Sequence, residues 1–195
     1  RVQTELGDDP SSEARLLRVL GEAQFNLSEY AAARSTLDLA ASRVADGSNP
    51  LLSSEIDALR GAVARTELRN DDAERYFERA LNQASTAAGS QSVAVGRIKG
   101  LSASTLVLLS RFKDAQAVAE SAYALLANQL GNDHPETITA LVSLGAVQEQ
   151  LRQDVEAQTN LRSAVGLIEQ RFGTQDARLV KPLLLLGEVL RRNRD

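Results

Sequence analysis

Glycine recurs at a nearly fixed interval along this chain. Five glycines are separated by steps of 40, 42, 42 and 42 residues: Gly7, Gly47, Gly89, Gly131 and Gly173. A second small residue follows each of them by fourteen positions: Gly21, Gly61, Ala103, Gly145 and Gly187. Two columns of alanine keep the same period. Self-similarity over such a period is typical of solenoids, in which each repeat buries its apolar face against its neighbours.

The composition excludes several classes of function. The chain is 43% hydrophobic and 25% charged, and no apolar run approaches the roughly 20 residues that a membrane span needs. A net charge of -4 gives no electrostatic reason to bind nucleic acid, because that affinity depends on neutralising phosphates. Without cysteine there is neither a disulfide nor a thiolate zinc site. We therefore expect no nucleic-acid partner and no membrane insertion.

Each repeat is predicted to fold as two antiparallel helices. In the clearest copy, residues 131–172, Pro135 opens a stretch of apolar residues at helical spacing. A polar turn at residues 152–154 separates it from a second stretch, which ends at Gly173. Glycine just past a helix supplies the left-handed closing residue. Each helix is expected to contain roughly 16 to 18 residues, about 25 Å in length.

Over the whole chain, this pattern predicts an all-α solenoid of about nine helices in a single domain, residues 1–195. The expected repeat units span residues 7–46, 47–88, 89–130, 131–172 and, in part, 173–195. The expected helices span residues 11–27, 29–45, 51–68, 71–87, 92–109, 112–129, 135–151, 154–171 and 176–192, with residues 1–6 as the tail of an earlier one. Because the sequence begins with arginine and contains no methionine, we expect it to be an excerpt of a longer protein.

The small and apolar positions resemble those of the tetratricopeptide repeat. In the fourth unit the matching residues are Leu141, Leu144, Gly145, Ala157, Leu161 and Ala164. The loop at residues 131–137 is similar to the inter-repeat loop of the 42-residue form found in kinesin light chains and in many bacterial regulatory proteins. The resemblance implies a right-handed superhelix of antiparallel helix pairs.

The second and third units depart from the family pattern. Polar residues, Asp57 with Arg60 and Lys99 with Ser102, stand where the family packs leucine. The apolar stripe runs one position away from them. A shift of one residue rotates the buried face by about 100° on a helix. Either these helices are rotated about their axes, or the repeat register is wrong by one residue within residues 51–109.

In tetratricopeptide arrays, the first helix of each pair lines a concave groove that holds partner peptides. The resemblance implies these groove residues: Arg15, Arg18, Glu22, Phe25, Glu55, Leu59, Arg65, Arg97, Leu101, Ser104, Val142, Glu149, Lys181, Leu184, Leu185 and Glu188. Their mixture of charge and apolar surface suits a segment held by a few anchors. The chaperone-tail clamp of the family needs lysine and asparagine where this chain has Arg18 and Glu22, so we do not expect that clamp.

We therefore expect a non-catalytic scaffold that binds a protein or peptide segment. No catalytic motif or cofactor site is recognisable, and the single histidine, His134, is interpreted as a helix-start residue beside Pro135. The opening of the chain is similar to repeat regions attached to bacterial serine/threonine protein kinases, which implies a larger bacterial signalling protein. We favour the cytoplasm, and the extracytoplasmic side of a membrane-anchored parent protein is the alternative.

The competing hypothesis is a self-association module that forms a homodimer. The last expected helix has no second helix to pair with, and it is apolar on more than one face. Its candidate contact residues are Leu183, Leu185, Leu186 and Leu190.

Overall fold

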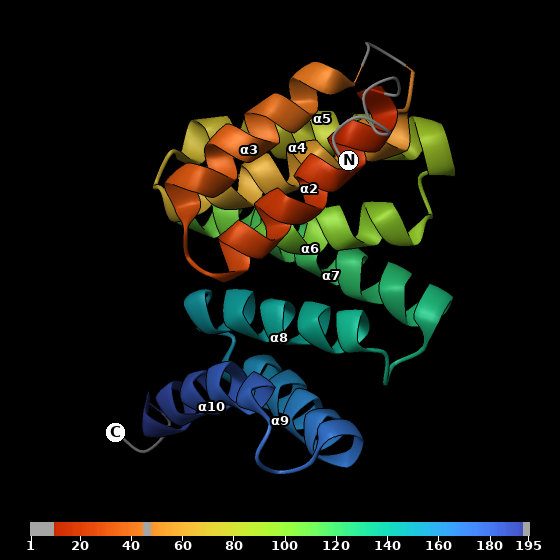
Figure 1. The fold of residues 1–195 in the computed structure, drawn as a ribbon. Coiled ribbons are helices and arrows are strands. Elements are labelled where there is room, and N and C mark those ends of the chain that lie inside the picture. Colours follow the sequence, from red (N-terminus) through yellow and green to blue (C-terminus); the bar gives the residue numbers. More distant parts are fainter. Residues whose placement is uncertain (1–9, 45–47, 193–195) are drawn as a thin grey trace. The chain divides into compact units, whose positions relative to one another are not determined.

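The computed structural model describes residues 10–44 and 48–192 (Figure 1). The chain divides into two compact units, Arg1–Ser90 and Gln91–Asp195. This division falls between the second and third predicted repeats, and the single continuous domain stays a prediction. Gly7, Gly47 and the predicted helix tail at residues 1–6 lie outside the described residues.

The first unit contains two helix hairpins. Their helices are α2 (Pro10–Asn26), α3 (Tyr30–Arg43), α4 (Pro50–Thr66) and α5 (Asn70–Ala88). The first helices of the two hairpins, α2 and α4, pack against each other, and α3 also packs on α4. Buried Ala14, Ala40, Leu52 and Ile56 join the two hairpins in one apolar cluster.

The second unit continues the pattern of helix hairpins. Its elements are α6 (Val93–Leu108), α7 (Phe112–Leu130), α8 (Pro135–Gln150), α9 (Asp154–Phe172), a short 3-10 turn (Ala177–Leu179) and α10 (Val180–Arg192). The described residues thus contain nine α-helices, as predicted, and the bounds agree within a few residues. The largest difference is at α10, which was expected to begin at residue 176. Asp176 instead caps the 3-10 turn, where its Oδ1 accepts a hydrogen bond from the Arg178 N–H at 2.9 Å.

Helix starts follow the local sequence. Pro50 and Pro135 stand in the first turn of α4 and α8, where the missing N–H of proline has no intrahelical partner in any case. Asn49 Oδ1 accepts a hydrogen bond from the Leu52 N–H at 3.1 Å. His134 Nδ1 accepts one from the Glu136 N–H at 3.3 Å. The histidine is therefore a capping residue.

The hairpins end at glycines with positive φ. Gly89, Gly131 and Gly173 have φ of 85°, 88° and 87°. Their ψ values of 152°, 160° and 167° differ from the left-handed helical conformation expected from the sequence. This extended region at positive φ is essentially restricted to glycine. The periodic glycines are therefore needed for backbone conformation, in a geometry other than the predicted one.

The turns inside the hairpins also repeat, without glycine. Ser28, Leu68, Ser110 and Arg152 have φ between 59° and 64°. In the first of these turns, the Glu29 N–H donates to the Gln24 carbonyl at 2.9 Å, and the Ser28 N–H donates to the Phe25 carbonyl at 2.9 Å. These two bonds define a Schellman motif, which satisfies the last carbonyls of the helix.

The recurring small residues have a packing role. A Cβ added to Gly21, Gly61 or Gly145 would lie 2.7, 2.9 or 2.8 Å from the large side chain sixteen residues later. These side chains, on the second helix of the same hairpin, are Leu37, Phe77 and Leu161. Because this pairing recurs at Gly61, the predicted register holds in α4.

In the middle repeats, polar residues stand at the positions where the family packs leucine, and their side chains form hydrogen bonds with other polar groups. Asp57 is buried, and its carboxylate accepts hydrogen bonds from Arg79 at 2.7 Å and from Arg60 at 3.3 Å. In α6, the Lys99 ammonium donates to the Ser121 hydroxyl at 2.8 Å. The departure from the family pattern is therefore a change of chemistry at fixed positions rather than a rotation of the helices.

Candidate functional site

The predicted groove residues of the first unit lie on α2 and α4, which pack side by side. Arg15 and Glu22 are exposed, whereas the others are partly buried: Arg18, Phe25, Glu55, Leu59 and Arg65. The structure thus brings all of them onto two neighbouring helices.

Three of these charges pair with one another. Arg18 contacts Glu22 on its own helix at 2.9 Å and Glu55 on α4 at 3.3 Å. Ion pairs at a surface contribute at most about 1 kcal/mol, because water screens them and long side chains lose entropy. These two ion pairs therefore add little to the stability of the first unit.

The opposite end of the same face holds a cluster that we call the Arg65 corner: Phe25, Tyr30, Leu59 and Arg65. The rings of Phe25 and Tyr30 have centroids 5.8 Å apart and are tilted by 55°. With Leu59, they pack on the buried side chains of Ala33, Leu37 and Val63. Burial lowers the pKa of the Arg65 guanidinium, and nearby Tyr30 offsets this in part. The corner combines an apolar floor with a partly desolvated cation.

Tyr30 was absent from the predicted groove set, because that set was confined to first helices. It is the first residue of α3, and it meets Phe25 across the hairpin turn. An aromatic residue at each end of a short turn is the sequence signal that could have indicated this contact.

In the second unit, Arg97 forms a bidentate pair with Glu136 on α8. The guanidinium donates to the two carboxylate oxygens at 2.7 and 3.0 Å. Leu101 and Ser104, further along α6, are partly buried, and Val142 on α8 is buried. Much of this face is therefore occupied by contacts within the unit.

Glu149 is buried at the end of α8, where Arg192 of α10 pairs with it. The same guanidinium also donates to Asp154 at 2.7 Å. The hydrogen bonds that Arg192 donates to Asp154 and, with a smaller effect, to Glu149 raise the pKa of Arg192. This predicted groove carboxylate therefore ties α10 to the α8–α9 hairpin.

The predicted residues of α10 divide into an exposed and a packed set. Lys181, Leu184 and Glu188 are exposed. Leu185 and Leu186 pack on buried Leu161 and Val189, and Leu190 is partly buried as well. Leu183 is 48% exposed. Only part of the proposed self-association surface is thus accessible in this unit.

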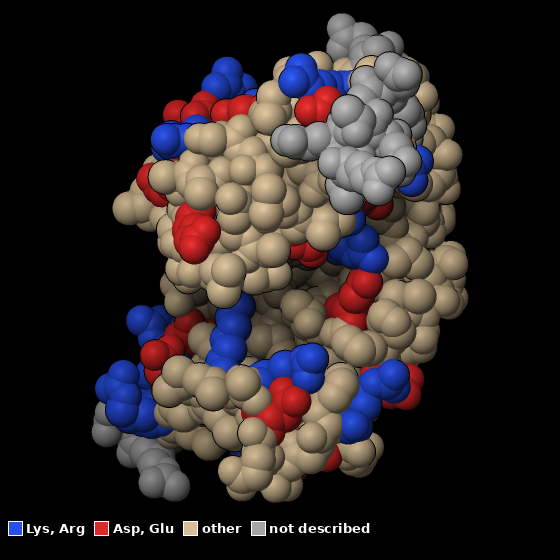
Figure 2. All heavy atoms as spheres, viewed as in Figure 1, with Lys and Arg blue, Asp and Glu red and all other residues tan. Residues whose placement is uncertain are grey.

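No metal-binding arrangement is present among the described residues, because no three histidine, aspartate or glutamate side chains come together suitably. Within the same residues, no helix has the length and apolar composition needed to cross a bilayer. Figure 2 shows basic and acidic side chains interspersed on the visible face.

Comparison with known proteins identifies the repeat. Residues 97–170 match the sequence model of the tetratricopeptide repeat. No curated protein matches the chain. The crystal structure of BtubC (BKLC) from P. vanneervenii is similar with a TM-score of 0.81 and 21% identity, and the match covers 99% of this chain and 79% of that one.

Two further solved structures share the fold. A putative kinesin light chain with nearly identical TPR-like repeats, from Podosopora anserina, has a TM-score of 0.74 at 14% identity, covering 96% of this chain and 89% of that one. Apo RapI has a TM-score of 0.69 at 16% identity, and the match covers 94% of this chain and 49% of RapI. This chain therefore spans about half the length of RapI. These likenesses confirm the predicted fold class, an all-α solenoid of helix hairpins. Residues 97–170 thus match the tetratricopeptide repeat in sequence, and the whole chain shares its fold with solved structures of such repeats.

Proposed function

We propose that this chain is a non-catalytic scaffold that binds a peptide segment of a partner protein on the first-helix faces of its units. The tetratricopeptide fold generally mediates protein–protein interaction, and its repeat scaffolds are generally non-catalytic. The proposal applies this general property to a particular surface.

The observation that supports the proposal is the mixture of side chains on these faces. In the first unit, partly exposed Phe25 and Leu59 lie on the same two helices as the Arg18 ion pairs. In the second, Leu184 is 66% exposed between Lys181 and Glu188 on α10. A few apolar anchors beside polar groups are the usual basis of peptide recognition.

The proposal is tested by selecting, from a library of random displayed peptides, those that bind this chain, and by measuring their affinities for it. Leu184→Asp places a charge on a first-helix anchor, whereas Val155→Asp changes a similarly exposed residue on the second helix α9. Some selected peptides should bind Leu184→Asp about tenfold more weakly than they bind the wild type. The same peptides should bind Val155→Asp as tightly as the wild type. Equal binding of every peptide to both variants would remove the first-helix face of the second unit from the function.

The biological setting proposed for this scaffold is a larger bacterial regulatory or signalling protein. Its support is the sequence resemblance to long-form repeats and to repeat regions attached to serine/threonine kinases. Any catalysis would then belong to other parts of that protein.

A second candidate function is self-association through α10. A Cβ at Gly187 would meet no atom within 4 Å, whereas the equivalent positions at Gly21, Gly61 and Gly145 are covered by leucine or phenylalanine. Light scattering over a hundredfold concentration range tests this candidate. A dimer that is lost in Leu183→Glu, but kept when exposed Val180 becomes Glu, would support it. A monomer at every concentration would reject it.

A further inference from the structure

Arg65 differs from every comparable arginine in the described parts of the chain. Five arginines there are partly buried: Arg18, Arg60, Arg65, Arg69 and Arg192. Four of them hold two carboxylates each: Arg18 with Glu22 and Glu55, Arg60 with Asp38 and Asp57, Arg69 with Glu67 and Asp72, and Arg192 with Glu149 and Asp154. Among the described residues, no carboxylate pairs with Arg65.

Glu67, the acid nearest to Arg65 in the sequence, and Glu55 on the same helix are already paired with other arginines. Glu67, two residues later, accepts hydrogen bonds from Arg69 at 2.6 Å and from Arg34 at 3.2 Å. Glu55, on the same helix, contacts Arg18. Pairing Arg65 with Glu67 or Glu55 would therefore require breaking an existing ion pair.

Arg65 lies close enough to Tyr30 to interact with it electrostatically, and Tyr30 packs on an apolar cluster together with Phe25 and Leu59. Phe25, Tyr30 and Leu59 form the rest of the corner and remain partly exposed. No ring of the described residues stacks on the Arg65 guanidinium, in contrast to Arg60, which lies 4.3 Å from the Tyr76 ring centroid. Burial also lowers the pKa of Arg65, which reports a charge that has lost water without gaining an acid.

We propose that the Arg65 corner binds an aspartate or glutamate side chain of a partner peptide, with an apolar residue next to that acid packed on Phe25, Tyr30 and Leu59. The guanidinium would supply paired N–H donors that match the geometry of a carboxylate. The apolar neighbour would cover the ring edges that water now contacts. This inference rests on the proposed function, because Phe25, Leu59 and Arg65 belong to the first-helix face.

A purely structural role for Arg65 predicts different behaviour. If only its aliphatic stem mattered, Arg65→Met would keep that packing and change neither binding nor stability appreciably. If Arg65 stabilised the fold through its charge, the melting temperature of Arg65→Met would fall. Our proposal predicts an unchanged or higher melting temperature together with weaker binding, because the substitution removes an unpaired charge that awaits a ligand.

The test uses random dodecapeptides displayed as N-terminal fusions, so that an acid can come only from a side chain. Peptides selected on the whole chain are synthesised with amidated ends, each with a partner in which Asp or Glu is replaced by Asn or Gln. Their affinities are measured by fluorescence anisotropy against the wild type, Arg65→Met and the control Arg43→Met. Arg43 is exposed and lies on α3, a second helix of the same unit.

Selected peptides should carry an acid next to an apolar residue. Replacing that acid should weaken binding to the wild type and to Arg43→Met about tenfold or more, since hydrogen bonds to charged groups are the stronger ones. It should have no effect on binding to Arg65→Met. Selected peptides that bind Arg65→Met as tightly as the wild type would overturn this inference and leave the scaffold function in place. Failure to select any peptide would overturn both.

Discussion

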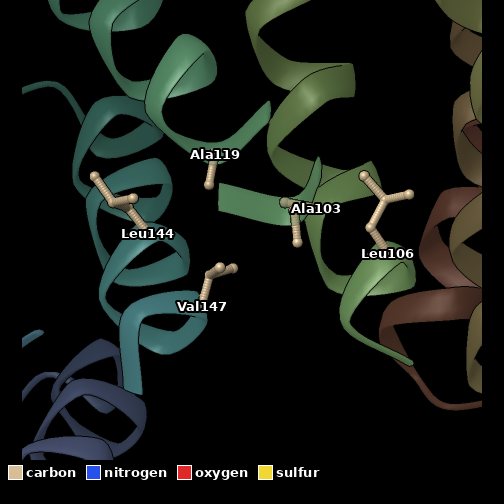
Figure 3. Packing of buried hydrophobic residues seen from close by; sticks show 6 residues of the cluster. Ala103, Leu106, Ala119, Leu144 and Val147 are labelled. Atoms are coloured by element: carbon tan, nitrogen blue, oxygen red, sulfur yellow. The ribbon is translucent and has the colours of Figure 1, made fainter. Parts of the chain in front are cut away.

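The α4–α5 hairpin of the first unit and the α6–α7 hairpin of the second fill the same space between their paired helices with different side chains. In the α4–α5 hairpin, the Phe77 ring lies against Gly61. At the equivalent positions of the α6–α7 hairpin, Ala103 meets Ala119 within one buried cluster (Figure 3). A glycine opposite a large residue is thus replaced by two alanines.

The consequence is a different dependence on the neighbouring hairpin. Leu144 and Val147 of α8 join Ala103 and Ala119 in the same buried cluster. In the first unit, Phe77 comes from within its own hairpin. The α6–α7 hairpin therefore relies on a helix outside itself for the apolar bulk that Phe77 supplies to α4–α5.

The same contrast applies to the packed position four residues before the small residue. It holds Asp57 in α4, Lys99 in α6 and Leu141 in α8. Asp57 and Leu141 are both buried, the first with arginine partners and the second in an apolar cluster. The repeat thus determines that the side chain at this position of α4 and α8 is buried. It does not determine whether that side chain is a charged residue with ion-pair partners or an apolar residue in a hydrophobic cluster.

The largest expected effect comes from removing the ring that fills the α4–α5 hairpin. Phe77→Ala should lower the free energy of unfolding by about 3–5 kcal/mol, because the cavity opposite Gly61 cannot be filled from within the hairpin. Chemical denaturation followed by circular dichroism measures this loss. Leu68→Ala, at a residue that is 75% exposed, should change stability by less than about 0.5 kcal/mol. A similar small loss for Phe77→Ala would show that the ring does not support the hairpin.

The next effect concerns the buried charge. Arg79→Met removes hydrogen bonds of 2.7 and 2.8 Å to Asp57, so we expect a loss of about 1–3 kcal/mol in the free energy of unfolding. Adding Asp57→Leu to Arg79→Met introduces the residue found at Leu141 and should restore part of that stability, because no buried carboxylate remains. If the double variant is less stable than Arg79→Met, the two kinds of burial are not interchangeable at this position.

The sequence predicts the helices and their register because small residues recur at the positions where backbones approach. Gly61 and Gly145 each contact the residue sixteen places later, so a local period is enough to place them. The family resemblance adds which helix lies on which side. These features depend on short-range spacing, which a single sequence records directly.

The ion pairs of the candidate site could not be predicted in the same way. The pairing of Glu149 with Arg192 and of Arg18 with Glu55 joins residues of different hairpins through long side chains. Among the described residues Arg65 has no such partner, and Glu67, two residues away, pairs with Arg34 and Arg69 instead. Several arginines compete for each acid, and only the three-dimensional arrangement decides which pair forms.

Replacing glycine by alanine should have opposite, smaller effects on stability at two kinds of position: those where a side chain of the neighbouring helix faces the glycine, and those where none does. Gly145→Ala places a Cβ 2.8 Å from Leu161 and should destabilise the second unit by about 1 kcal/mol. Gly187→Ala on α10 meets no atom within 4 Å and should stabilise by about 0.5–1 kcal/mol, because alanine favours a helix over glycine. Thermal melting of both variants decides the point. Equal shifts of the same sign would mean that helix propensity, rather than the facing side chain, controls these positions.

The smallest expected effect on stability comes from replacing the equivalent acids at the starts of α5 and α7, Asp72 and Asp114. Hydrogen bonds from Arg75 and Arg69 lower the pKa of Asp72 below its ordinary value of 3.8. Its contribution to stability is therefore present above pH 3.8 and is lost as the pH falls through the lower folded-state pKa.

The equivalent acid, Asp114, accepts a hydrogen bond from Arg111 at 2.8 Å, and alanine replaces the second arginine at position 117. Asp72→Asn should therefore lower the melting temperature at pH 6 slightly more than Asp114→Asn does. The difference between Asp72→Asn and the wild type should shrink as the pH falls below 3.8. A difference that persists unchanged into strong acid would assign the effect of Asp72 to helix capping geometry rather than to its charge.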